Sequence, residues 1–260
     1  MKLLEMTQSS HNEITMQDLK MAAQHTKPYL EHSGAASNPR QLYRGFNTNS
    51  RRVNPNSLSF VATRFDREPL STLPSVHRAF DSAFKRAFHY PYRSASAFAT
   101  LDKSQAAHYG DIFEVVPAGN NYQFCFSPQM IDLYADVDTF VYEGKGNFPG
   151  FVQFARGEPD VDQEALDDHD NHMIDINFIV QEFPQEFQRW CDYLVNSIYQ
   201  ETTQTSKLDP HAEVMIACEG VIAVPLRKQY AQEVHDQFGD IFELDPIESI
   251  VPLLNLVANS

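Results

Sequence analysis

The chain of 260 residues contains 42% hydrophobic and 12% aromatic residues and has a formal net charge of −15. This length and composition are typical of a folded protein with a buried core and exclude a largely disordered chain. The acidic balance also disfavours a protein whose main task is to coat nucleic-acid phosphate.

Three cysteines lie far apart, at Cys125, Cys191 and Cys218, and no CxxC pair occurs. They form neither a disulfide framework nor a zinc-ligand pattern, so we expect a reducing compartment and no metal site. The start of the chain turns polar too soon for a signal peptide, and there is no run of 18 apolar residues. We therefore expect a cytoplasmic protein that does not enter a membrane.

Two amphipathic helices are predicted in the first third of the chain. Thr15 is expected to cap a helix over residues 15–32, whose apolar residues recur at helical spacing. In the helix predicted over residues 73–88, Phe80, Phe84 and Phe88 recur at every fourth residue. We expect this apolar stripe to pack against a sheet.

The other predicted elements are shorter. Strands are predicted at 41–46, 96–101, 112–116, 122–126, 214–217 and 221–225. Helices are predicted at 103–109 and 185–199, and the tail is a helix-and-loop segment containing the apolar stretch 250–257. Loops are predicted at 33–39 and 53–69, a turn at 117–120 and a loose acidic stretch at 144–171. Helices come first and strands later, without βαβ alternation, which predicts the α+β class.

Three short, widely separated segments contain the candidate site residues. In the first, Arg44 precedes Gly45 on a predicted strand. In the second, Thr100 lies near the end of a strand that leads into a helix. In the third, Glu213 follows His211 and enters an apolar strand.

The order of these segments resembles the arginine–serine–glutamate class of ADP-ribosyltransferases, found in clostridial toxins, vertebrate ecto-enzymes and phages. That family has Arg-Gly on its first strand, then Phe-x-Ser-Thr-Ser leading into a helix, a strand ending in Pro-x-Gly, and Glu-x-Glu or Gln-x-Glu before an apolar strand. The matching stretches here are Leu42-Tyr43-Arg44-Gly45, Phe98-Ala99-Thr100-Leu101-Asp102, Ile112 to Gly119 and His211-Ala212-Glu213-Val214-Met215-Ile216. The resemblance spans roughly residues 41–225, and the overall phrasing is most similar to phage-encoded members.

The resemblance implies a split, strongly bent pair of mixed or antiparallel β-sheets around an NAD cleft. Glu213 would hold a ribose hydroxyl and stabilise the cationic ribose that forms when nicotinamide leaves. Arg44 would hold a phosphate or ribose oxygen with its two-pronged guanidinium, and Thr100 would orient the glutamate or the ribose. The backbone of Gly45 would hold the nicotinamide amide, and Tyr109 would stack on a ring of NAD.

Two departures from the family pattern keep a second interpretation open. Thr100 replaces the first serine, and Leu101 and Asp102 occupy the other two positions of that motif. His211 stands where the family has Glu or Gln, so modification of an arginine acceptor does not follow. The second interpretation is a degenerate ADP-ribosyltransferase fold that serves as a binding or structural protein, for example in a virion.

We therefore expect one ADP-ribosyltransferase-like domain over residues 1–260, with its core at about 41–128 and 205–226 and an insertion at about 129–204. The expected activity is transfer of ADP-ribose from NAD to a protein or nucleic-acid acceptor. The insertion is expected to recognise that acceptor, and His211 to contact it.

Overall fold

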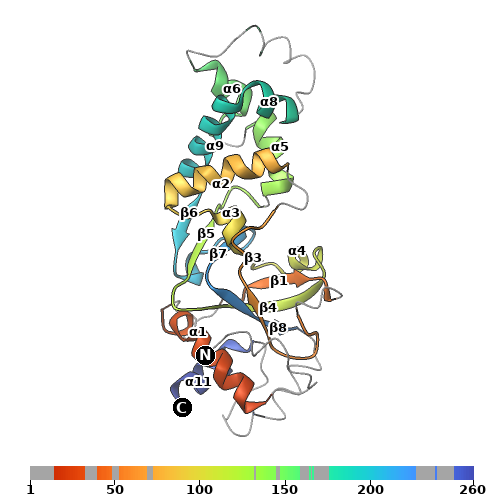
Figure 1. Ribbon diagram of the computed structural model, residues 1–260, viewed down its shortest axis with the longest axis vertical. Coiled ribbons are helices and arrows are strands. Elements are labelled where there is room, and N and C mark those ends of the chain that lie inside the picture. Colours follow the sequence, from red (N-terminus) through yellow and green to blue (C-terminus); the bar gives the residue numbers. More distant parts are fainter. Residues whose placement is uncertain are drawn as a thin grey trace. The chain divides into compact units, whose positions relative to one another are not determined.

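The protein is described by a computed structural model that covers residues 15–32, 40–48, 53–68, 73–131, 133–144, 147–158, 164, 166, 176–226, 238 and 249–260 (Figure 1). The chain divides into two compact units. The sheet unit consists of Met1–Arg64, Ser96–Cys125 and Glu201–Ser260, and the helical unit consists of Phe65–Ala95 and Phe126–Gln200. The second segment of the helical unit overlaps the range 129–204, and its first segment lies within the range 41–128.

Eight strands form the sheet. They are β1 (Tyr43–Phe46), β2 (Ser59–Ala62), β3 (Ala97–Thr100), β4 (Asp111–Ala118), β5 (Gln123–Phe126), β6 (Gln200–Thr202), β7 (Glu213–Ala217) and β8 (Gly220–Pro225). Their order is β2-β8-β4-β1-β3-β7-β5-β6. The pairs β1–β3, β1–β4, β2–β8, β3–β7 and β4–β8 are antiparallel. Together with the helices, this sheet confirms the α+β class.

Strands β2 and β6 lie outside the strands that the sequence predicted. The stretch expected to be a loop at 53–69 contains β2, which pairs with β8 over four residues. The strand was not predicted because it is only four residues long and follows Asn and Pro residues that are typical of loops. Strands β7 and β8 follow each other in the chain but are not neighbours, because β8 lies between β2 and β4 whereas β7 lies between β3 and β5.

In the described part of the sheet unit, the sheet is accompanied by the helices α1 (Met16–His32), α4 (Lys103–Ala107) and α11 (Val251–Asn259). At the start of α1, the Thr15 hydroxyl accepts from the Asp18 N–H at 3.2 Å, and the Asp18 carboxylate accepts from the Thr15 N–H at 2.9 Å. This reciprocal capping explains why the predicted helix begins where it does. Helix α11 packs against α1 (Figure 1).

The helical unit contains α2 (Pro74–Phe88), α3 (Tyr92–Ala95), α5 (Leu133–Tyr142), α6 (Phe151–Arg156), α8 (Ile176–Glu182) and α9 (Pro184–Ile198). The predicted helices at 73–88 and 185–199 are confirmed, but the expected packing of the first against a sheet is wrong. Its aromatic stripe packs against α9 instead: the rings of Phe84 and Tyr199 are 4.7 Å apart, and those of Phe80 and Trp190 are 6.4 Å apart. Two amphipathic helices thus cover each other's apolar faces.

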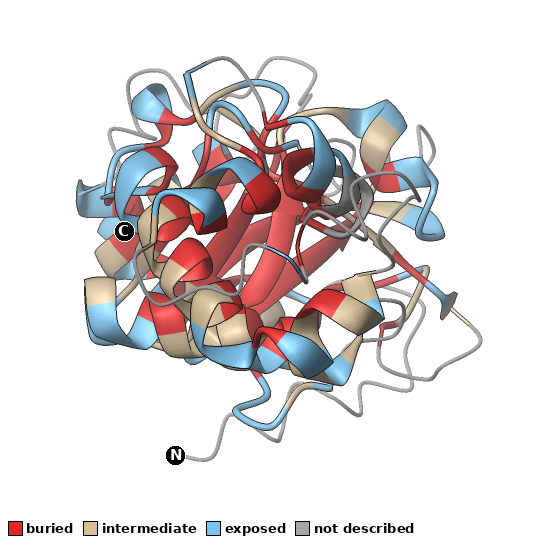
Figure 2. Cartoon of the chain, turned by 90° about the horizontal axis from the view of Figure 1, so that it is seen from above, coloured by how far each residue is buried: buried red, intermediate tan, exposed pale blue. Residues whose placement is uncertain are grey.

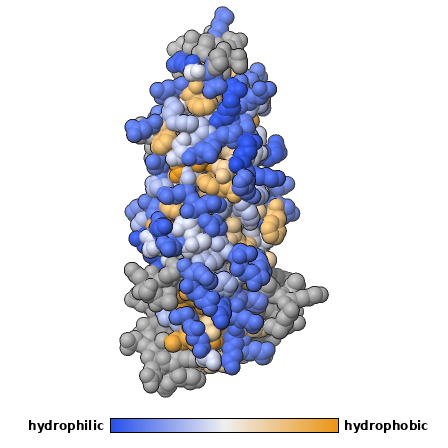
Figure 3. All heavy atoms as spheres, turned by 90° about the vertical axis from the view of Figure 1, so that its left-hand side faces the viewer, coloured by the Kyte–Doolittle hydropathy of each residue, from blue (hydrophilic) through white to orange (hydrophobic). Residues whose placement is uncertain are grey.

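Burial follows the elements closely. Figure 2 shows strands that are buried along most of their length, whereas the helices are buried on one side and exposed on the other. On the face drawn in Figure 3, hydrophilic residues predominate and apolar residues appear as small separate patches. Among the helices that the structure describes, none is long and apolar enough to cross a membrane.

Candidate functional site

The three segments singled out in the sequence lie on neighbouring strands. Arg44 is on β1, Thr100 ends β3 and Glu213 begins β7, and these strands are consecutive in the sheet. About 56 residues separate the first two positions and 113 separate the second two, by their numbers in the chain. The sheet therefore brings together residues that no local sequence pattern connects.

The register places Thr100 directly beside Glu213. Tyr43 of β1 opposes Thr100 of β3, and Thr100 opposes Glu213 of β7. Residues directly opposite each other in an antiparallel pair share one face of the sheet. The Thr100 hydroxyl and the half-buried Glu213 carboxylate therefore lie on the same face, together with the ring of Tyr43.

The hydroxyl of Thr100 is engaged at the start of α4. It donates to Gln105 Oε1 at 2.5 Å and accepts from the Asp102 N–H at 3.1 Å. A hydroxyl has a single proton, so Thr100 can accept one more hydrogen bond but has no proton left to donate to Glu213. In this arrangement the first contribution of Thr100 is to fix the β3–α4 junction.

Arg44 lies on the other face of β1. Side chains alternate along a strand, so Arg44 shares its face with Phe46 and not with Tyr43. The contacts agree, because the Arg44 guanidinium carbon lies 4.9 Å from the centre of the Phe46 ring. Arg44 also opposes Phe113 of β4 in the register. The structure thus unites Thr100 and Glu213 and directs Arg44 away from them.

Gly45 is required by the helix that crosses over it. A Cβ on Gly45 would lie 2.2 Å from the carbonyl oxygen of Ala106 in α4 and 2.8 Å from the carbonyl carbon of Tyr109. Gly110 has a φ of 134°, and a Cβ there would lie 2.4 Å from the carbonyl oxygen of Phe46. Two glycines therefore let the chain after α4 pass directly across β1. Tyr109, expected to stack on NAD, is 60% exposed at this crossing.

His211 is exposed and lies two residues before the start of β7. Its backbone N–H donates to the Asp209 carboxylate at 2.9 Å, which fixes the turn that leads into β7. Hydrogen bonds from Ser104 lower the pKa of Asp102, and the positive charge of His211 contributes to the same direction. His211 and Asp102 are therefore electrostatic neighbours, close to the ends of β3 and β7.

One titratable residue near Thr100 and Glu213 in the sheet, Glu114, was not singled out from the sequence. Glu114 of β4 opposes Tyr43 on the side away from Thr100, so Glu114, Tyr43, Thr100 and Glu213 form one transverse row. Glu114 is 1% exposed, and burial raises its pKa to about 6. A lone carboxylate within the apolar run Ile112 to Val116 was the available signal.

Glu114 holds the start of α11. Its Oε1 accepts from the Ser249 hydroxyl at 2.5 Å, and its Oε2 accepts from the Ile250 N–H at 3.1 Å. These two bonds lower the pKa of the carboxyl and so oppose the effect of burial, as does the positive charge of Lys103. The Lys103 ammonium itself lies 5.0 Å from the centre of the Tyr43 ring. Glu114 thus has a structural partner on each side.

No metal centre is evident in the described part of the chain: it contains no group of three His, Cys, Asp or Glu residues arranged to hold an ion. In the acidic stretch at 144–171, residues 145–146, 159–163, 165 and 167–171 lie outside the described residues. The three cysteines are buried and free, and burial raises the pKa of each thiol, which makes them poor nucleophiles.

Comparison with known proteins found no relative of this chain. No protein-family model matches the chain. No curated protein and no solved structure matches it either.

Proposed function

We propose that this chain cleaves the bond between nicotinamide and ribose in NAD and transfers ADP-ribose to a macromolecular acceptor. One observation carries the proposal: the three motif-bearing strands β1, β3 and β7 are consecutive in the sheet, with Thr100 directly opposite Glu213. The family that the sequence resembles requires a hydroxyl and a carboxylate from these two motifs to act together.

The reaction follows from the chemistry of the reacting bond. The bond between C1′ of the ribose and the nicotinamide nitrogen breaks, and its electron pair leaves with nicotinamide. The ribose becomes oxocarbenium-like, and a nucleophile of the acceptor then bonds to C1′ and loses its proton. Glu213 stabilises the cationic ribose through its charge and through a ribose hydroxyl.

We assign to His211 the removal of the acceptor's proton. His211 lies in the turn that leads into β7, two residues before Glu213. A neutral imidazole can act as a general base for a hydroxyl, an amide or a nucleobase nitrogen. The exposed position of His211 leaves it open to a large acceptor.

The position of Arg44 favours a second candidate function. The proposal needs the NAD diphosphate to reach the Phe46 face of β1, where the Arg44 guanidinium lies. If it does not, the row of Thr100 and Glu213 belongs to a binding or structural protein with an ADP-ribosyltransferase-like sheet and no cleavage. The hydroxyl of Thr100 also favours this second function, because its proton is already donated to Gln105.

Release of nicotinamide from NAD separates the two candidates. Wild type is expected to release nicotinamide, and Glu213→Gln is expected to release it about 100-fold more slowly, since the charge that stabilises the ribose is lost. Glu182→Gln, an exposed carboxylate of α8, is the matched control and should behave as wild type. No release by wild type, or equal rates for wild type and Glu213→Gln, would overturn the proposal.

A further inference from the structure

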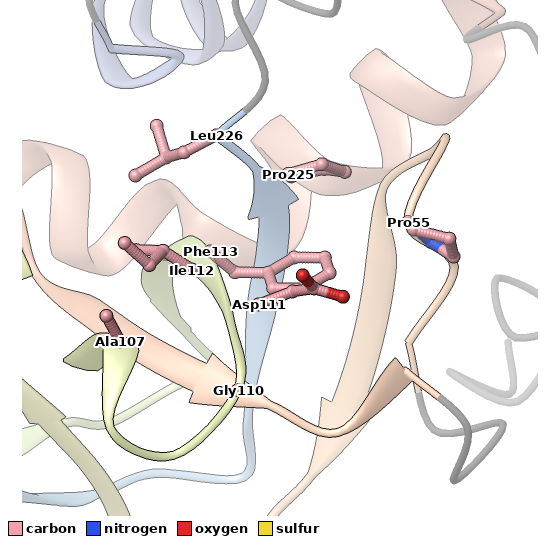
Figure 4. Close-up of a pocket in the computed structure, with 8 residues that line it drawn as sticks. All are labelled: Pro55, Ala107, Gly110, Asp111, Ile112, Phe113, Pro225 and Leu226. Carbon is pink, nitrogen blue, oxygen red and sulfur yellow. The ribbon is translucent and has the colours of Figure 1, made fainter.

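A hollow of about 300 Å³ lies in the sheet unit where β4 begins and β8 ends (Figure 4). Its walls are about equally polar and apolar. They include Phe113, which is 1% exposed, and the side chains of Pro55, Pro225 and Leu226. Small-molecule sites usually have more strongly apolar walls, so the polar share of this lining favours a ligand with a charged group as well as an apolar part.

Asp111 contributes the one charged side chain of the lining. Its Oδ2 accepts from the Thr48 hydroxyl at 2.8 Å, which fixes the carboxylate and leaves Oδ1 available. Within the described part of the chain, no cation forms an ion pair with Asp111. The guanidinium of Arg44 lies over Phe46 and is not part of the lining.

We propose that this hollow binds an alkyl cation, with the hydrocarbon part against the apolar side chains of the lining and the ammonium or guanidinium group on Asp111. A lysine or arginine side chain has this division into an apolar stem and a charged end, and so does a free alkylamine. Anions are disfavoured, because the lining supplies a negative charge and the whole chain has a net charge of −15.

The site is separate from the row of Thr100 and Glu213, and the inference does not depend on NAD chemistry. Asp111 opposes Phe46 in the register, on the face of β1 that also holds Arg44. Thr100 and Glu213 lie on the opposite face, with Tyr43. Occupation of the hollow can therefore be measured while the NAD reaction is left out.

The test is an NMR titration of the full chain with n-butylammonium chloride, compared with 1-butanol at constant ionic strength. The two probes have similar size and differ in charge. The cation is expected to shift the amide signals of Gly110, Ile112 and Leu226 and to bind about tenfold more tightly than the alcohol, the effect of a charge-assisted hydrogen bond. Equal affinities, or shifts confined to other regions, would overturn the proposal, and this comparison needs no variant.

Two variants and a control then locate the contact. Asp111→Asn is expected to weaken butylammonium binding about tenfold, whereas Glu143→Gln, an exposed carboxylate of the helical unit, removes the same charge and should have no effect. Ala107→Leu places a larger side chain at the edge of the hollow and should abolish binding while Asp111 remains. Unchanged binding by Asp111→Asn, with the rest of its spectrum intact, would contradict the assignment.

The same titration with N-acetyl-lysine N-methylamide distinguishes the source of the cation. If this compound binds as tightly as n-butylammonium, the hollow accepts a lysine side chain presented on a polypeptide. If n-butylammonium binds and this compound does not, the hollow is for a free amine. If neither binds, the proposal is wrong.

Discussion

Replacing Glu114 with glutamine is expected to remove a pH dependence from the stability of the sheet unit. Burial raises the pKa of Glu114 from its ordinary value of 4.5 to about 6. A rise of this size corresponds to about 2 kcal/mol, because one pKa unit is worth about 1.4 kcal/mol. The folded state therefore holds this proton more tightly than the unfolded state does.

The sign of the effect follows from that difference. Below pH 4.5 the residue is protonated in both states, and its contribution to stability is complete. As the pH rises through about 6, the buried carboxyl must ionise, and about 2 kcal/mol is lost. Glutamine does not titrate, and its amide can donate to the Ser249 hydroxyl while its oxygen accepts from the Ile250 N–H.

Hydrogen exchange of the β4 and β8 amides, corrected for intrinsic rates, reports the free energy of opening of this unit. The free energy of opening of Glu114→Gln minus that of wild type should increase by about 2 kcal/mol between pH 4.5 and pH 7.5. Other carboxylates titrate in both proteins and cancel in this difference. A difference that stays constant over this range would refute the argument.

Three further predictions concern other parts of the chain. Burial, followed by the positive charge of Arg93, lowers the pKa of His77 from 6.5, so the helical unit should lose stability as the pH falls through 6.5. Urea unfolding followed by the fluorescence of Trp190, the single tryptophan, should show this loss in wild type and not in His77→Gln. Gly45→Ala should destabilise the sheet unit by about 1–3 kcal/mol, because its Cβ meets the backbone of α4, while Gly157→Ala, whose nearest atom is 3.3 Å away, should cost less. Thermal melting of both variants measures this, and a larger loss of stability for Gly157→Ala than for Gly45→Ala would contradict the prediction. His211→Ala should reduce transfer to an acceptor much more than it reduces NAD hydrolysis, and parallel losses in the two assays would remove His211 from the acceptor site.

Elements with a strong local signal were predictable from the sequence. The stripe of Phe80 and Phe84 predicted α2, and Thr15 predicted the start of α1. The partner of α2 was not predictable, since a period of four residues shows that a face is apolar but not which element covers it. The four-residue strand β2 was missed because so short a segment is recognised mainly by its pairing with β8.

Part of the candidate site was likewise predictable from the sequence, and part was not. The sequence predicted that Thr100 and Glu213 lie at the ends of two strands, and the structure makes those strands neighbours. It did not predict the face of Arg44, because a shift of one residue in the register moves a side chain to the other side of a strand. Gly45 was interpreted as space for a ligand, whereas the structure fills that space with the backbone of α4.

The central claim is that this chain transfers ADP-ribose, and transfer of a label from NAD tests it most directly. NAD labelled at its adenylate phosphate would be incubated with the chain and a cell lysate, and the macromolecules separated under denaturing conditions. A labelled macromolecule is expected with wild type and with Glu182→Gln, and none with Glu213→Gln. Absence of label with wild type, or equal labelling by Glu213→Gln, would contradict it.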